Sequence, residues 1–298
     1  CWRCDTPLLN YATSSWFVAV EKIKEQMLAG NAATEWVPSH IRDGRFGKWL
    51  EGARDWLISR QRYWGTPLPI WKCDGCPADP VVVGSYEELF DQAGIPRAER
   101  PADPYDRSQF DPHRPFIDQL AWPCHATGCG GTMRRVDDVI DAWFDSGAMP
   151  FAQHHYLGRP LPHFDPETGV GYPADFIAEA VDQTRGWFYT LHVLGTLLFD
   201  RVAYDHCIVM GHVNDEQGRK MSKRLGNVVD PMAVLEETGA DALRWYFYAN
   251  DPEQPSRFSG QVRPRSAMAI NRACASAASR PARGATASAA CPSRPRRA

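Results

Sequence analysis

The sequence predicts an α/β protein built around a parallel sheet, with an insertion that carries its own metal site. The first observation is the order of elements in residues 175–210, where two short apolar strands flank a helical stretch. The second is a Pro- and Asp-rich segment that contains paired cysteines. The third is a strongly basic loop, residues 218–227, that follows the second strand. Together they indicate a sheet with a phosphate-binding edge and a separate insertion that a bound metal ion stabilises.

The strand and helix pattern of residues 175–210 defines the sheet. Residues 175–180 and 206–210 have the apolar character of strands, and residues 183–199 form a helix with an apolar stripe of Trp187, Leu191, Leu194 and Leu198. A strand, a helix and a second strand in this order form a right-handed crossover between parallel strands. Ligands of such sheets bind at the carboxyl ends of the strands. We therefore expect functional side chains at those ends.

A helical region is predicted beyond the basic loop. Asp230 can cap a helix that has Pro231 at its first position and Gly239 at its end. Residues 240–248 continue the helical pattern with large apolar side chains. After about Phe258 the aliphatic residues almost disappear, so we expect a disordered Ala- and Arg-rich tail over residues 261–298.

The first seventy residues mix strand, helix and cationic signals. Residues 16–20 are predicted as a strand and residues 21–28 as a short helix. Residues 36–70 interleave arginine with aromatic side chains, a pattern that fits either nucleic-acid binding or amphipathic packing around a core. These residues are Arg42, Arg45, Arg54, Arg60, Arg62, Trp49, Trp56, Tyr63 and Trp64. Lone Cys207, in an apolar strand, is expected to be plain core.

Residues 73–134 are predicted to be an irregular insertion, because they hold many Pro and Asp residues and little aliphatic core. Such a segment needs a cross-link or a bound metal ion to stabilise it. Two thiol pairs lie about fifty residues apart, which is typical of a closed four-sulfur zinc site formed by Cys73, Cys76, Cys124 and Cys129. Four reduced cysteines without metal, with His125 as a neighbour or substitute ligand, are the alternative. Cys1 and Cys4 form a further possible half-site.

Composition bounds the partners and the compartment. The 298 residues have a formal net charge of −3, but the tail holds eight arginines and no acidic residue, which leaves a net charge of −11 over residues 1–260. Nucleic-acid contacts must then rest on local patches or on missing domains. No apolar run approaches the 18 or so residues of a membrane span, and no secretory signal opens the chain, so we expect a cytoplasmic protein without a membrane partner.

The loop at residues 218–227 carries the strongest functional signal. It crowds four cations together with Ser222 and two glycines. Lys220 and Lys223 are point charges that can neutralise a triphosphate, and Ser222 can donate a hydrogen bond. A basic surface loop without function is the alternative for such a run taken by itself.

Several motifs in this order resemble those of class I aminoacyl-tRNA synthetases. Lys-Met-Ser-Lys-Arg at residues 220–224 is similar to the family's KMSKS signature. Further similarity lies in four stretches, residues 1–4, 54–67, 138–147 and 174–189. Asp-Gln-Thr-Arg-Gly-Trp at residues 182–187 resembles the isoleucyl enzymes in particular. Valyl or leucyl relatives, and a non-catalytic zinc-bearing tRNA-binding module, are the alternatives.

The resemblance implies activation of L-isoleucine by Mg-ATP and transfer of the amino acid to tRNA(Ile). Lys220, Lys223 and Ser222 would act on the phosphates, with Lys223 binding ATP. Glu179 would contact the aminoacyl-adenylate, and Asp182, Gln183 and Trp187 would surround the amino acid. Read without the family, Asp182 or Thr184 could simply cap a helix. Ala180 departs from the family, where glycine is common, and its methyl group would crowd a close approach of the backbone to the ligand.

The resemblance also implies a domain plan, in which the chain is the second half of a Rossmann-type catalytic domain. Residues 1–72 would return from an editing insertion, residues 73–135 would bind zinc, and residues 136–230 would complete the Rossmann-type core. Residues 231–260 would start a helical stem ahead of the tail. The family's His-x-Gly-His element does not occur in the sequence. We therefore expect a fragment, monomeric and inactive alone, that lacks an N-terminal half.

Overall fold

The computed structural model describes residues 6–9 and 11–259. The chain divides into two compact units, which are described separately. One comprises Leu9–Ile177 and Asp182–Cys207, and the other contains Ala178–Val181 and the residues from Ile208 on. The predicted half-site at Cys1 and Cys4 and the predicted tail from residue 261 lie outside the described residues.

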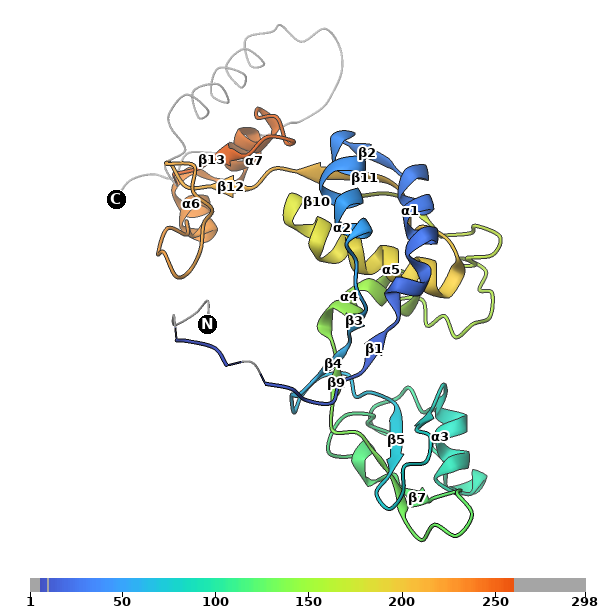
Figure 1. Cartoon of the computed structure of the whole chain (residues 1–298). Helices are drawn as coiled ribbons and strands as arrows, with labels where there is room; N and C mark the ends of the chain where they lie inside the picture. Colours follow the sequence, from blue (N-terminus) through green and yellow to red (C-terminus); the bar gives the residue numbers. More distant parts are fainter. Residues whose placement is uncertain (1–5, 10, 260–298) are drawn as a thin grey trace, which may run out of the picture. The chain divides into compact units, whose positions relative to one another are not determined.

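The central sheet has three strands in the order β10, β11, β2 (Figure 1). β10 (Ala174–Ala180) and β11 (Tyr204–Met210) are the two predicted strands, each slightly longer at its start, and β2 is Glu35–Val37. Helix α5 (Trp187–Phe199) connects β10 to β11, as expected of a crossover. The predicted helix start was wrong by one turn, because a 3₁₀ turn, η5 (Val181–Arg185), precedes α5.

Helix α5 forms the centre of the larger unit. It packs against α1 (Lys24–Ala33) and α4 (Ala142–Ala152), and α1 packs against α2 (Gly47–Glu51). The core around it is aromatic: Trp36 lies 4.7 Å from Phe46 and 6.0 Å from Phe188 between ring centroids. Every α5 residue from Phe188 to Thr196 is buried, whereas Leu198 is 51% exposed. The predicted apolar stripe was therefore wrong at its last member.

Short strands connect this core to the insertion. β1 (Phe17–Val18) pairs antiparallel with β3 (Trp56–Leu57), and β4 (Ser59–Arg60) pairs antiparallel with β9 (Val139–Ile140). The predicted strand at residues 16–20 is thus shortened, because a 3₁₀ turn, η1 (Val20–Ile23), already begins at Val20. Cys207 is fully buried on β11, as predicted.

The insertion is a folded module, so the expectation of an irregular, core-poor segment was wrong. It has a four-stranded sheet in the order β6 (Val81–Val82), β5 (Ile70–Cys73), β8 (Thr132–Arg135), β7 (Trp122–Pro123), and a helix, α3 (Tyr86–Gln92). Its core comprises Trp71, Val83, Leu89, Ile117, Trp122 and Met133. Short 3₁₀ turns, η3 (Arg97–Glu99) and η4 (Ile117–Gln119), complete it. Val83, Leu89 and Ile117 supply aliphatic surface to this core, and two tryptophans add large buried rings.

The second unit holds the basic loop and two helices. β12 (Val213–Asn214) pairs in parallel with β13 (Ser256–Arg257). α6 (Pro231–Thr238) begins as predicted, since the Asp230 side chain accepts a hydrogen bond from Met232 N at 2.9 Å, and α7 (Ala240–Tyr248) follows. In residues 6–9 and 11–259, none of the helices combines the length and apolar character that crossing a bilayer requires.

Candidate functional site

The basic loop is held in a defined shape by a buried carboxylate. Asp215, which is 6% exposed, accepts hydrogen bonds from Arg219 N at 2.7 Å, Arg219 Nε at 2.9 Å and Asn227 Nδ2 at 2.9 Å. Asn227 Oδ1 in turn accepts from Ser222 N at 2.9 Å. The hydrogen bond from Asn227 is the main reason that the pKa of Asp215 lies below its usual value. One carboxylate thus links the two ends of the loop.

The predicted loop residues differ in their surroundings. Ser222 Oγ accepts a hydrogen bond from Leu225 N at 3.2 Å, so this hydroxyl orders the loop. Lys220 and Lys223 are exposed, and neither forms an ion pair with any residue that the structure describes. Gly218 and Gly226 have φ values of 80° and 64°, the left-handed region that glycine allows. The loop therefore presents two free ammonium groups on an ordered backbone.

Three of the predicted amino-acid residues, Asp182, Gln183 and Trp187, lie together where η5 leads into α5. Glu179 is exposed on β10. Gln183 Oε1 accepts from Trp187 N at 2.9 Å, and its Nε2 lies 3.5 Å from Asp182 Oδ2. Trp187 Nε1 donates to Ser146 O at 3.0 Å, which fixes the indole. Gly186 is the N-cap residue of α5, and the first amide of the helix is bonded by the Gln183 side chain, whereas sequence alone had offered Asp182 or Thr184 as the cap.

Thr184 has a structural task instead. It is fully buried, and its Oγ1 accepts a hydrogen bond from Arg45 Nε at 2.9 Å. Gly186, between η5 and α5, leaves no room for a side chain, because a Cβ there would lie 2.7 Å from Gln183 Oε1 and 2.9 Å from the Trp143 ring. Glycine at this position thus allows the Gln183 amide and the Trp143 ring to pack against the backbone.

The four predicted metal ligands converge on one point. Sγ atoms of Cys73, Cys76, Cys124 and Cys129 all lie within 4.8 Å of one another. The Cys73–Cys129 and Cys76–Cys124 sulfur distances are 3.6 and 3.7 Å. Tetrahedral zinc with Zn–S bonds of about 2.3 Å requires sulfur separations of roughly 3.8 Å, whereas a disulfide requires about 2.0 Å. The cluster therefore fits a four-coordinate metal ion.

Backbone amides surround this cluster. Gly75 N donates to Cys73 Sγ at 3.3 Å, Ala126 N to Cys124 Sγ at 3.5 Å, and Gly131 N to Cys129 Sγ at 3.4 Å. The Gly75 amide lowers the pKa of Cys73 to about 7. Hydrogen bonding among the sulfurs, chiefly with Cys129, raises the pKa of Cys76 to about 12. One thiolate is thus accommodated by the protein alone, and a cation is needed to stabilise four.

The residues that sequence reasoning missed are the ones that shape these sites. Asp215 and Asn227 lie at either end of the basic loop, and no spacing rule for short loops marks them. Gly75 and Gly131 lie face to face, since a Cβ on Gly131 would be 2.7 Å from Cys73 Sγ and 2.9 Å from Gly75 N. The available signal was a glycine two residues after a cysteine, since Gly75 follows Cys73 and Gly131 follows Cys129 at this spacing.

The chain has relatives of known family. A family model described as tRNA synthetases class I (I, L, M and V) matches residues 9–259. The isoleucine--tRNA ligase of Thermus thermophilus is 50% identical over 260 residues, which are 87% of this chain and 23% of that protein. The isoleucine--tRNA ligase of Treponema denticola is 51% identical over 246 residues, which are 83% of this chain and 21% of that protein.

The fold of the chain also resembles a solved structure. The ternary complex of Agrobacterium radiobacter K84 agnB2 LeuRS with tRNA and LeuAMS aligns with a TM-score of 0.51 at 26% identity, covering 80% of this chain and 30% of that one. The chain spans about a quarter of the length of its isoleucine--tRNA ligase relatives. It belongs to the class I tRNA synthetases and corresponds to part of an isoleucine--tRNA ligase.

Proposed function

We propose that this chain supplies one half of the site that activates L-isoleucine with Mg-ATP and then transfers it to tRNA(Ile). The reaction joins the isoleucine carboxylate to the α-phosphorus of ATP and releases pyrophosphate. The observation that carries the proposal is the ordered basic loop, with Lys220 and Lys223 free on a backbone that Asp215 and Asn227 hold. The identity with isoleucine--tRNA ligases supports isoleucine as the substrate.

The loop would act by positioning and by neutralising charge. The leaving pyrophosphate gains negative charge in the transition state, and a preorganised ammonium group near it lowers the barrier. Lys223 would bind the phosphates, Lys220 would support it, and Ser222 would order the loop, as its hydrogen bond with Leu225 N supports. Closure of the loop over ATP would be the conformational step.

The end of β10 and the start of α5 would bind the amino acid and the adenylate. Asp182 would offer a carboxylate to the substrate ammonium, and Glu179 would contact the adenylate. Trp187, fixed by its bond to Ser146 O, would supply a rigid apolar wall near Gln183. Gln183 already uses its Oε1 in capping α5, so only its Nε2 would be available to substrate.

The cysteine cluster would hold one structural zinc ion. Four sulfur ligands leave no open position for water, so the metal would contribute folding free energy to the insertion. Elemental analysis of the purified chain should find about one zinc per chain. Cys76→Ser should abolish it and increase protease cleavage near the cluster, whereas Cys207→Ser, outside the cluster, should leave the zinc content unchanged. A metal-free wild-type chain would contradict this part of the proposal.

The activity is tested by isoleucine-dependent exchange of pyrophosphate into ATP. Because the sequence contains no His-x-Gly-His element, exchange should require a second polypeptide that carries it, such as the corresponding part of the Thermus thermophilus relative. Exchange should favour isoleucine over valine and leucine. Robust exchange by the chain alone would show that the two-part site is wrong, and a preference for valine or leucine would show that the substrate is wrong.

A further inference from the structure

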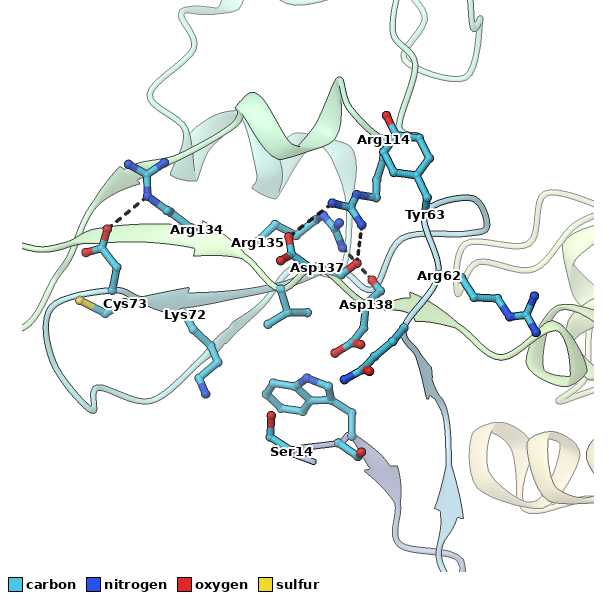
Figure 2. A pocket seen from close by; sticks show the side chains of 15 residues that line it. Ser14, Arg62, Tyr63, Lys72, Cys73, Arg114, Arg134, Arg135, Asp137 and Asp138 are labelled. Carbon is cyan, nitrogen blue, oxygen red and sulfur yellow. Dashed lines mark hydrogen bonds and ion pairs between the residues drawn. The ribbon is translucent and has the colours of Figure 1, made fainter. Parts of the chain in front are cut away.

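A wide cavity lies where the insertion meets the strands that carry it. Its volume is about 870 Å³, and it is lined from three directions: the segment before β1, the residues after β4, and strands β5 and β8 (Figure 2). All of its lining residues belong to one compact unit of the chain. None of them is assigned to the activation site or to the ligand set of the cysteine cluster except Cys73, whose neighbour Lys72 faces the cavity.

The cations of this cavity fall into two groups. Arg114 bonds Asp118 at 2.8 Å, Arg134 bonds Asp74 at 3.1 Å, and both are thereby held in the wall. Lys72 and Arg62 are exposed, and neither has an ion-pair partner in the described part of the chain. Figure 2 shows Lys72 directed into the open cavity, whereas the Arg62 side chain extends away from Lys72, on the other side of the segment that follows β4. Lys72 is therefore the side chain that is free to bind an anionic group inside the cavity.

The cavity also contains an acceptor and aromatic surfaces. The Asp138 carboxylate faces the same open space as Lys72 (Figure 2), and it makes no ion pair with any described residue. Trp16 also lines the cavity. Tyr63 is 61% exposed, and the Arg114 guanidinium lies 5.1 Å from its ring centroid. A simple anion site would have no carboxylate at its centre, since like charges repel.

A cation, a free carboxylate and exposed aromatic faces together match one kind of ligand. A nucleotide has a phosphate for Lys72, a base face that stacks on an aromatic ring, and amino groups on its edge that can donate to a carboxylate. We propose that this cavity binds an unpaired nucleotide of an RNA strand. The inference rests on the proposed function for its choice of RNA and adds a docking surface for that partner.

The charge of residues 1–260 restricts where these residues can attract RNA. Their net charge is −11, so attraction of a polyanion by this part of the protein must be local. The arginine and aromatic residues of residues 36–70 fall into two groups, one bonded inside the fold and one at the cavity. Arg45 and Arg60 bond Thr184 and Asp141 inside the fold, whereas Arg62 and Tyr63 remain at the cavity.

Binding of a fluorescein-labelled, mixed-sequence single-stranded octaribonucleotide to the full chain tests the inference. Lys72→Gln and Tyr63→Ala should each weaken binding by about tenfold, the scale of one phosphate contact or one stacked base. Lys72→Gln should also reduce the salt slope by about one. Lys48→Gln removes an exposed lysine of α2, outside the cavity, and should change neither quantity. Zinc content is measured for each variant because Lys72 precedes Cys73.

Asp138→Asn tests for contact with the base, because a purely structural role of Asp138 would not change the preference among bases. It should alter the preference among oligo(A), oligo(C) and oligo(U) and leave the salt slope unchanged, since it touches the base edge and not the phosphate. Equal effects of Lys72→Gln and Lys48→Gln would overturn the inference. So would full competition by a heparin oligosaccharide with no effect of Tyr63→Ala, because that result describes a general polyanion patch.

Pyrophosphate exchange, measured on the same variants with the complementary polypeptide, separates this inference from the proposed function. Normal exchange in Lys72→Gln with weakened oligonucleotide binding supports both. Absent exchange in every protein, with binding that still depends on Lys72, overturns the proposed function alone. Normal exchange with binding that ignores Lys72, Tyr63 and Asp138 overturns the nucleotide site alone.

Discussion

Gly131 decides whether the two halves of the cysteine cluster can close on each other. A Cβ at this position would lie 2.7 Å from Cys73 Sγ and 2.9 Å from Gly75 N, distances that force the backbone or a ligand to move. At Gly130, the preceding residue, a Cβ would meet no other atom within 4 Å, and the φ value is not left-handed. The two glycines therefore form a matched pair, one crowded and one open.

Gly131→Ala should weaken metal binding by about 10- to 100-fold, the range for disturbing groups that orient metal ligands. Gly130→Ala should bind metal as the wild-type chain does. Competition for zinc against a chromophoric chelator measures both variants. Equal affinities of the two alanine variants would mean that the cluster can shift to accept a methyl group. The close approach of Gly131 to Cys73 would then have no role in metal binding.

Asp215 has a comparable role in the basic loop. Asp215→Asn removes the charge that Arg219 and Asn227 both contact, so the loop should open and trypsin should cleave after Lys220, Lys223 or Arg224 about tenfold faster or more. The matched control is Asp230→Asn, because asparagine caps a helix as well as aspartate does. Unchanged cleavage in Asp215→Asn would mean that other contacts order the loop.

The response of the basic loop to low pH follows from the direction in which the pKa of Asp215 is shifted. The pKa of Asp215 is lowered, mainly by Asn227, so its carboxylate stabilises the fold above the unfolded pKa of about 3.9. This contribution is lost only as the pH falls through the lowered native value. The loop should therefore be equally ordered between about pH 5 and 8. The protection of the Arg219 amide against hydrogen exchange, relative to an unfolded chain at the same pH, measures this order.

At the scale of elements, one buried histidine joins α1 to α5. His192 is 1% exposed, its Nε2 donates to Met27 O at 2.7 Å, and its Nδ1 has no hydrogen-bond partner among the described residues. Burial lowers the pKa of His192 from 6.5 to about 4. Above pH 6.5 the side chain is neutral whether folded or unfolded. As the pH falls below 6.5 the unfolded chain takes up a proton first, so stability is lost.

This difference predicts a loss of about 2 kcal/mol in the free energy of unfolding between about pH 7.5 and pH 5. Urea unfolding at the two pH values measures it in the wild type and in His192→Gln, which should lose this part of the pH dependence. His125→Gln makes the same change at an exposed histidine and should keep it. The same pH dependence in all three proteins would assign it to other groups.

Elements with local signals were predictable from the sequence. The cap at Asp230, the proline that follows it and the glycine at 239 define α6, and the structure has them as expected. β10, α5 and β11 were predicted because each has its own apolar period. Cysteine spacing likewise predicted the four-sulfur cluster, because coordination geometry constrains ligand pairs strongly.

Elements that depend on distant partners were not predictable in this way. The insertion's core joins Trp71 to Trp122, with ring centroids 5.1 Å apart, and its strands are only two to four residues long. Strands of that length have no readable period, so their pairing is set by the core and the cysteine cluster. The Asp215 network was missed for a related reason, because hydrogen bonds across a loop leave no regular spacing in the sequence.

For the whole molecule, the contrast between overall and local charge bears on catalysis. The net charge over residues 1–260 is −11, so ATP meets an acidic chain. Attraction of its phosphates must come from groups that are free and close, and Lys220 and Lys223 are exposed and form no ion pair within residues 6–9 and 11–259. If the proposed function holds, removing one of these ammonium groups should affect the transition state more than the bound substrates.

Lys223→Ala should lower isoleucine-dependent pyrophosphate exchange by on the order of 10²–10³, the scale for one preorganised group that stabilises transition-state charge. The assay uses this chain together with a polypeptide that supplies the His-x-Gly-His element. The effect should fall on the rate, with the KM for isoleucine nearly unchanged, because the loop acts on phosphate and not on the amino acid. Lys22→Ala removes an exposed lysine remote in sequence from the loop and should exchange as the wild type does. A raised KM for isoleucine at an unchanged rate would place Lys223 in amino-acid binding instead.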